Sequence, residues 1–323
     1  MRPLPSTVLV FVLCTSAAPA AAQWPPAKLE NLRVLPDTIP PRELIALMAD
    51  FTRALGVRCT HCHVGEEGRP LATYDFPSDE KATKRKAREM LRMVIAINGR
   101  HLTNLEERAD PPVRVQCVTC HAGRTTPRQL EDVLVLAYAA GGIDSARAAY
   151  DELRERYYGR AAYDFGSVPL TIVADTIRNR GSLPDAVAVL VLNVEMNPTS
   201  VFAKRQHGHD AVLLAFRTQG VDAGVARYHA LRDAYGTDGF PEFELNDLGY
   251  ALLRGGNVPE AVAAFTLTVE AFPRSANAYD SLGEAYVAAG DTTKAIVNYR
   301  RSLELNPRNA NAEKVLRALG ARR

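Results

Sequence analysis

Two segments of the chain, residues 59–63 and 117–121, carry the pattern Cys-x-x-Cys-His. The spacing sets two thiols about one helical turn apart, so that both can bond the vinyl groups of one porphyrin. The adjacent imidazole then serves as an axial ligand of the iron. We therefore predict two covalently attached c-type haems. Their predicted thioether and proximal iron ligands are Cys59, Cys62, Cys117, Cys120, His63 and His121.

Other uses of four cysteines explain these segments less well. A structural zinc site of the Cys-x-x-Cys type does not require a histidine directly after each second cysteine. A disulfide framework suits an exported protein but leaves both histidines without a role. A thioredoxin-like pair needs a βαβ pattern, which the surrounding sequence lacks.

An apolar helical face precedes each motif. The first helix is predicted to begin near residues 40–41, where proline is tolerated, and to stop at Gly56. The second is predicted to begin after Ser78 as N-cap and to close at residues 98–99. Their apolar positions follow a helical period: Leu44, Leu47, Met48, Phe51 and Leu55, then Ala87, Met90, Leu91, Met93, Val94 and Ile97.

The two helices align as an internal repeat, which indicates the sixth iron ligands. Met48, Phe51, Ala54 and Leu55 match Met90, Met93, Ala96 and Ile97 at identical spacing. A methionine thioether opposite a histidine fills the second axial position of the iron and raises its potential. We predict Met48 and Met90 as these ligands. Met93, one turn from Met90, is the alternative for the second haem, and packing within a core is the alternative role for all three.

Three segments, residues 55–63, 88–98 and 115–123, resemble the cytochrome c subunit of photosynthetic reaction centres. That family repeats a helix, a tight turn and Cys-x-x-Cys-His, and most of its haems take a methionine from the helix. The resemblance covers roughly residues 28–128. It implies haem-ligating roles for Met48, His63, Met90 and His121, with thioether links at the four motif cysteines. The subunit in phototrophs carries four haems, whereas this sequence has two motifs.

Residues 1–22 read as a secretory signal peptide. Arg2 precedes the apolar run 8–13, and three alanines at 20–22 offer a cleavage site before Gln23. Export agrees with c-type haem attachment, which takes place outside the bacterial cytoplasm. We expect a periplasmic protein. The alternative is a protein anchored to the outer face of the inner membrane, although Leu13 before Cys14 does not fit a lipidation motif.

Composition and length suggest two soluble domains. Of the 323 residues, 47% are apolar and 24% charged, which is typical of globular proteins. The net charge of +2 gives no basis for nucleic-acid binding. We predict an all-α protein, with a dihaem cytochrome c domain over residues 23–128 and a repeat array over residues 129–323.

The repeat array has the 34-residue period of tetratricopeptide repeats. Gly249, Gly256, Ala261, Phe265 and Pro273 recur at Gly283, Gly290, Ala295, Tyr299 and Pro307. Weaker copies lie around Gly141, Gly181 and Gly220, with an irregular loop at residues 157–167. The pattern predicts five helix-turn-helix units in an α-solenoid, whose concave surface suits a protein partner. The alternative is an array that only supports the haem domain or drives self-association.

Other polar residues have less specific predicted roles. The basic run of the second helix is either a docking patch or a solvated helix face: Lys81, Lys84, Arg85, Lys86, Arg88 and Arg92. The histidines of the repeat region, His207, His209 and His229, are expected at the surface or in packing.

Together these features predict an exported electron carrier. Two iron atoms with both axial positions filled exchange electrons with a redox protein donor and acceptor but have no open site for a substrate. The repeats would hold a protein partner, and a membrane electron-transfer complex is one candidate. Two alternatives remain: a dihaem peroxidase with a labile ligand, and a tetratricopeptide adaptor in which the haems are mainly structural.

Overall fold

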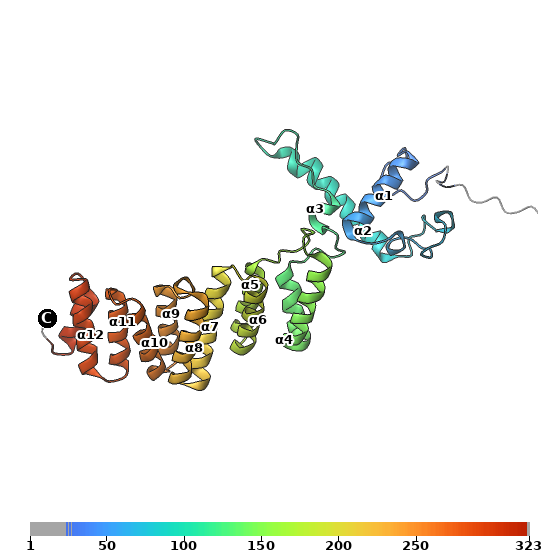
Figure 1. Ribbon diagram of the computed structural model, residues 1–323. Coiled ribbons are helices and arrows are strands. Elements are labelled where there is room, and N and C mark those ends of the chain that lie inside the picture. Colours follow the sequence, from blue (N-terminus) through green and yellow to red (C-terminus); the bar gives the residue numbers. More distant parts are fainter. Residues whose placement is uncertain (1–23, 25, 27, 322–323) are drawn as a thin grey trace, which may run out of the picture. The chain divides into compact units, whose positions relative to one another are not determined.

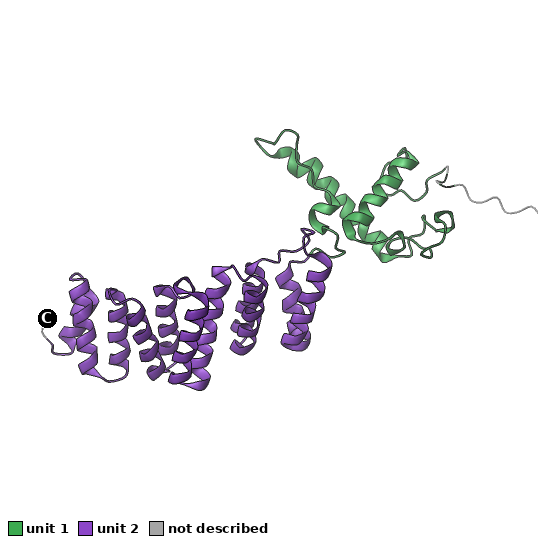
Figure 2. Cartoon of the chain, viewed as in Figure 1, with its two compact units in different colours: residues 1–127 green, residues 128–323 purple. Residues whose placement is uncertain are grey.

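The computed structural model describes residue 24, residue 26 and residues 28–321 (Figure 1). The predicted signal peptide lies outside these residues. The chain divides into two compact units, residues 1–127 and 128–323 (Figure 2). Within the described part the regular structure is helical, apart from one isolated antiparallel bridge between Val64 and Asp75. The predicted all-α fold class is confirmed. None of the helices described is long and apolar enough to cross a membrane.

The first unit has two long helices, α1 (Pro41–Leu55) and α2 (Ala82–Ala96), and the short helix α3 (Cys117–His121). Between them lie the 3-10 turns η1 (Cys59–His61), η2 (Leu71–Thr73) and η4 (Leu102–Asn104) and the π-helical turn η3 (Ile97–His101). Helix α1 begins with proline in its first turn and ends at Gly56, as predicted, where φ is 66°. A Cβ at Gly56 would lie 2.3 Å from the carbonyl oxygen of Gly123, so the close approach also requires glycine.

Helix α2 departs from the prediction at both ends. Ser78 is not its N-cap: the Ser78 hydroxyl accepts a bond from the Glu80 amide, and the helix begins at Ala82 without a side-chain cap. The helical conformation also does not end at residues 98–99, because α2 is followed directly by the π-helical turn η3. Within this turn the Asn98 side chain exchanges hydrogen bonds of 2.7 and 2.8 Å with the backbone of Val115. This contact holds the segment that leads into the second motif.

The second unit is a row of helix pairs (Figure 1). In chain order its helices are α4 (Leu130–Tyr157), α5 (Ser167–Asn179), α6 (Leu183–Met196), α7 (Val201–Gln219), α8 (Val221–Tyr235), α9 (Glu242–Arg254), α10 (Val258–Ala271), α11 (Ala276–Ala288), α12 (Thr292–Leu305) and α13 (Ala310–Ala318), with the 3-10 turn η5 (Thr237–Gly239) before α9. Because the backbone is non-helical at Gly141 and Gly142, α4 is two helices in sequence. Up to residue 321 the described array thus has the five predicted helix pairs, closed by α13.

The 34-residue period follows from one packing contact made twice. A Cβ at Gly249 would lie 2.5 Å from the Phe265 ring, and one at Gly283 would lie 3.0 Å from the Tyr299 ring. Both rings are almost completely buried. A large aromatic ring on the second helix of a pair therefore requires glycine on the first, which allows the two helices to approach closely.

Candidate haem sites

A cavity of about 630 Å³ lies beside the first motif. It is lined by Met48 of α1 together with Cys59, Cys62 and His63, so the structure brings together every residue predicted for the first haem. Most of the remaining wall is apolar and comes from the segment before α1, both long helices and the loop between them. Its apolar members include Trp24, Leu29, Leu32, Val34, Leu35, Leu44, Ile45, Phe51, Leu55, Val57, Leu71, Tyr74, Phe76 and Leu91. Volume and lining both fit a porphyrin, since cofactor sites are concave, mostly apolar and typically about 300–1,000 Å³.

The charged residues on the wall of this cavity are mostly basic. Lys28, Arg33, Arg58, Lys84 and Arg88 line it, whereas Glu30 is the acidic residue among the described lining. A haem carries two propionate groups, and cationic side chains at the edge of an apolar site offset their charge. The donor set and the charge of the site therefore agree with a haem.

His63 is held in the neutral form that binds a metal. Burial lowers the pKa of His63, and the positive charge of Lys84 lowers it further. The Phe76 ring packs edge-on against the imidazole, with 4.9 Å between the ring centroids. The Nδ1 atom of His63 is buried and makes no hydrogen bond within the described residues.

The motif cysteines are free thiols in the described chain. Burial raises the pKa of Cys62 and of Cys117, so both thiols are protonated at neutral pH. Among the residues described, no group of three His, Cys, Asp or Glu side chains is placed to share a metal ion. The two motifs thus form two separate pairs of thiols rather than one four-cysteine cluster.

Each motif rests on the long helix that precedes the other motif. The carbonyl groups of Thr60 and His61 in the first motif accept hydrogen bonds from Lys81 and Thr83 at the start of α2. The amide of Gly123, just after the second motif, donates a 2.8 Å hydrogen bond to the Ala54 carbonyl at the end of α1. Each motif is therefore held in place by hydrogen bonds to the helix that precedes the other motif.

The second motif forms the helix α3, and its histidine is well oriented. Gln116 and Thr119 make a capping box at its start, and Ala122 ends it in the left-handed conformation. His121 Nδ1 lies 2.8 Å from the Arg124 carbonyl oxygen. When Nδ1 donates this bond, Nε2 is left free to bind a metal, and the ring is fixed in direction.

Met90 and Met93 both lie on the exposed surface of α2, 43% and 46% accessible. Neither lines the cavity of the first motif. Other apolar side chains of this half are exposed as well, at Ile95, Leu105, Val113 and Val118. The region around the second motif thus offers apolar surface and two methionine thioethers. The structure does not favour Met90 over Met93 as an iron ligand, so Met90 stays a prediction.

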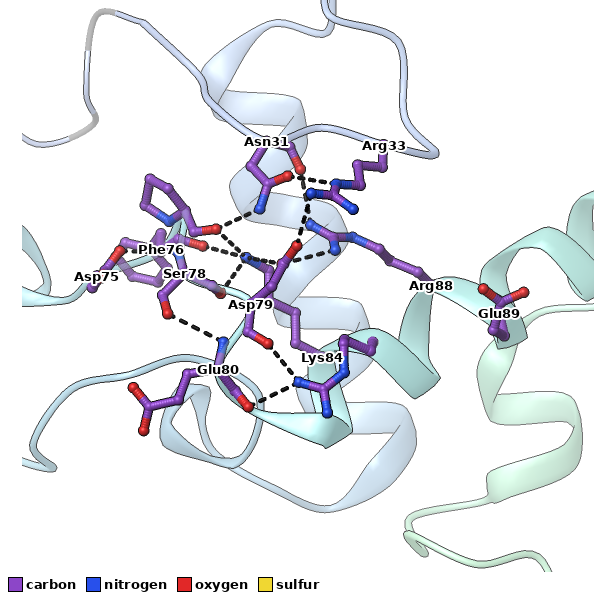
Figure 3. Close-up of polar contacts among 12 residues, drawn as sticks. Asn31, Arg33, Asp75, Phe76, Ser78, Asp79, Glu80, Lys84, Arg88 and Glu89 are labelled. Atoms are coloured by element: carbon purple, nitrogen blue, oxygen red, sulfur yellow. Dashed lines mark hydrogen bonds and ion pairs between the residues drawn. The ribbon is translucent and has the colours of Figure 1, made fainter.

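The basic run of α2 is not a uniform patch or solvated face, because Lys84 and Arg88 are turned inward (Figure 3). Lys84 Nζ donates to the carbonyl oxygens of Phe76, Pro77 and Ser78 at 2.7, 3.0 and 2.7 Å. Arg88 pairs with Asp79 at 2.7 Å. The spacing of Lys84, Arg88 and Leu91 on one helical face was the signal that could have revealed this.

The predicted roles of the remaining histidines agree with their positions. His207 is buried, and its Nδ1 lies 2.7 Å from the Tyr235 hydroxyl, which is a packing role. His209 lies 3.0 Å from Asp210, and His229 is exposed.

Two families of known proteins account for most of the described chain. Residues 38–129 match the family described as photosynthetic reaction centre cytochrome C subunit. Residues 209–276 and 246–310 match the tetratricopeptide repeat. The predicted resemblance and its order along the chain are confirmed. Comparison with curated proteins gives no match.

Several solved structures are similar to this chain. A crystal structure of MamA protein is 22% identical, with a TM-score of 0.31, and covers 56% of this chain and 92% of its own. A thermophilic tetratricopeptide repeat protein of Thermus thermophilus is 15% identical, with a TM-score of 0.30, over 59% and 96% of the two chains. YrrB, described as a tetratricopeptide repeat protein with an unusual peptide-binding site, is 14% identical, with a TM-score of 0.31, over 58% and 90%.

Proposed function

We propose that this chain, in which a reaction-centre cytochrome c segment precedes tetratricopeptide repeats, is an exported electron carrier with two covalently bound c-type haems. Cys59 and Cys62 hold the first haem, with His63 and Met48 as axial ligands. Cys117 and Cys120 hold the second, with His121 and Met90 as axial ligands. The haems exchange electrons with redox protein partners, and the repeats hold a protein partner.

One observation carries the proposal: the first unit has almost no apolar core of its own. Among its described residues, Ala54 is the one apolar side chain that is buried, at 3% exposure. The apolar residues of both long helices instead surround the cavity or lie on the surface. Folding of a small unit depends on the burial of apolar surface. A porphyrin in each half supplies the apolar surface that these side chains lack.

The residues around the first cavity have clear roles toward such a group. A bound haem supplies one-electron redox chemistry at its iron. Cys59 and Cys62 would hold the haem covalently, and His63 and Met48 would ligate its iron, so that no ligand position would be left for a substrate. The apolar wall keeps water away, and the basic residues at its edge offset the propionate charge. This arrangement favours electron transfer over a peroxidase.

The proposal is tested by producing the full chain with a haem-attachment system and measuring haem by pyridine haemochrome. We expect two haems per chain that resist extraction by acidified organic solvent. The double variant Cys59→Ser/Cys62→Ser should retain one haem, and so should Cys117→Ser/Cys120→Ser. Colourless protein, or haem that extracts completely, would overturn the proposal. Release with the periplasmic fraction is expected, and retention in the membrane fraction would favour the anchored alternative.

A further inference from the structure

Lys84 is a charged side chain buried beside the first candidate haem site. The residue is 9% exposed, and its ammonium group donates to the three successive carbonyl groups of residues 76–78 (Figure 3). A lysine has three N–H donors only when it is protonated, so this set of bonds requires the charged form. Asp79 lies 3.3 Å away, and its carboxylate also pairs with Arg88 at 2.7 Å and with Arg33 at 3.4 Å.

The charge around Lys84 is therefore not balanced. Three cations, Lys84, Arg88 and Arg33, share the single carboxylate of Asp79, with Asp75 a more distant acidic neighbour of Lys84. The three cations line the cavity, whereas neither acid belongs to its described lining. Lys84 and Arg88 are shielded from water, with side chains 11% and 14% exposed, whereas Arg33 is 65% exposed. With Glu30 as the acidic residue of the described lining, the first haem site still faces a net positive charge.

Lys84 is also bonded to the residue that packs against His63. The Phe76 carbonyl accepts a 2.7 Å hydrogen bond from Lys84, and the Phe76 ring packs edge-on against the His63 imidazole. The Nδ1 atom of His63 makes no hydrogen bond among the described residues. His121 differs, because its Nδ1 lies 2.8 Å from the Arg124 carbonyl oxygen. In the first unit's described residues, Lys84 is also the one charged residue that is buried.

Both effects act in the same direction on an iron bound by His63. A hydrogen bond from Nδ1 makes an imidazole ligand more basic and stabilises the oxidised iron, so its loss favours the reduced state. A positive charge in a site of low polarity also favours the reduced state, which carries one positive charge less. Around His121 both effects are weaker. Its Nδ1 has a carbonyl partner, and the neighbouring cation Arg124, whose Nε donates to the His121 carbonyl at 3.2 Å, is only half-buried.

We propose that Lys84 sets the potential of the first haem, raising it above that of the second, by its buried positive charge beside the cavity. The inference rests on the proposed function, since it assigns a role toward a haem bound by His63. Lys84 is a positioning residue in this scheme, because it acts through its charge rather than by ligating the iron.

The test is an equilibrium redox titration of the full haem-loaded chain. The redox wave whose midpoint potential changes in the Met48→Leu variant is assigned to the first haem. We expect it to be the higher of the two waves in the unaltered protein. Lys84→Met should make reduction of the first haem about tenfold less favourable, a fall of about 59 mV for one electron, and leave the second wave in place. Lys86→Met is the matched control: it removes the same charge from an exposed position of the same helix and should move neither wave.

A second pair of variants separates charge from structural damage. Asp79→Asn removes the shared carboxylate and should raise the potential of the first haem, opposite in sign to Lys84→Met. Lys84→Arg keeps the charge and should restore most of the potential. Structural damage to the loop would instead shift the potential of the first haem in the same direction in Lys84→Met and in Asp79→Asn.

The inference is overturned if the potential of the first haem is the same in Lys84→Met as in the unaltered chain. It is also overturned if Lys84→Met and Asp79→Asn shift that potential in the same direction, or if the first haem has the lower potential of the two in the unaltered chain. Should Lys84→Met fail to fold, Asp79→Asn and Lys84→Arg carry the test. Failure of the proposed function looks different, because the unaltered chain would then carry no covalent haem and show no haem wave at all.

Discussion

Single residues decide the chemistry of the first site. Met48 and His63 line one cavity from different elements, α1 and the segment after η1, and no other methionine of the described chain lines it. The thioether is a weak but specific ligand for haem iron, and it favours the reduced state. The second site is less complete at this scale, since His121 is oriented by Arg124 while Met90 and Met93 both remain accessible on α2.

Replacing Met48 by leucine should lower the potential of one haem. The substitution keeps the volume of the side chain, so we expect a loss of folding stability below about 1.5 kcal/mol. It removes the sulfur ligand, and the optical spectrum of that haem should shift toward high spin while the covalent haem content stays at two. Redox titration with absorbance detection measures both effects.

Met196→Leu in the second unit is the control and should leave both potentials unchanged. If Met48→Leu left the spectrum low-spin and the potential unaltered, Met48 would be a packing residue of the cavity wall.

At the scale of elements, helices are joined by polar contacts that short-range patterns do not reveal. In the second unit, His207 of α7 and Tyr235, the last residue of α8, are linked by a 2.7 Å contact between Nδ1 and the hydroxyl. Burial lowers the pKa of His207 from 6.5 to about 4. Its Nε2 is buried without a partner among the described residues. The helix pair is therefore built around a neutral imidazole.

Acid should weaken the second unit through His207. As the pH falls below 6.5 the unfolded chain takes up a proton that the folded chain does not take up until about pH 4. Stability is therefore greatest above pH 6.5, declines between about 6.5 and 4, and loses roughly 2–4 kcal/mol across that range from this group. Urea unfolding of residues 128–323 at pH 7, 6 and 5, followed by circular dichroism, measures this dependence.

His229→Gln removes an exposed histidine and is expected to leave the pH dependence in place, whereas His207→Gln should flatten it. An unchanged slope in His207→Gln would show that other groups govern the response to acid.

At the scale of the whole molecule, the two units obtain their apolar cores in different ways. The second unit buries leucine and aromatic side chains between successive helices, for example Leu245, Leu248 and Phe265. The first unit surrounds a cavity and buries one apolar residue among those described. Folding of the second unit is therefore expected to be independent of haem, and folding of the first to depend on it.

Separate production of the two units tests this difference. Residues 128–323 alone should give a helical protein with one cooperative unfolding transition and no haem. Residues 1–127 should be folded and carry two haems when made with a haem-attachment system, and should lack a cooperative transition when made without it. Circular dichroism and thermal unfolding measure each case.

The same pair of proteins separates electron transfer from partner binding. Residues 1–127 should accept and release electrons at the rates of the full chain while failing to form its partner complex. A cooperative, haem-free first unit would contradict the role given to the porphyrin in folding.

Local patterns were sufficient for much of this protein. The limits of α1 and the five helix pairs are predictable from spacing, because helix periodicity, glycine stops and repeat contacts act over a few residues or recur at one fixed interval. Spacing also selected Met48, Cys59, Cys62 and His63, which line one cavity, while their roles toward a haem stay predictions. The matches to the cytochrome c and tetratricopeptide families agree with that prediction.

Tertiary structure alone determined the surroundings of the first site. The sequence pattern places Lys84 in a basic surface run, yet the residue lies inside, bonded to a loop that also sets Phe76 against His63. The predicted start of α2 is likewise wrong, since Ser78 belongs to that loop rather than to a helix cap. Which charged side chain becomes buried depends on the carbonyl groups that the folded chain presents to it, and those come from segments whose approach no local pattern encodes.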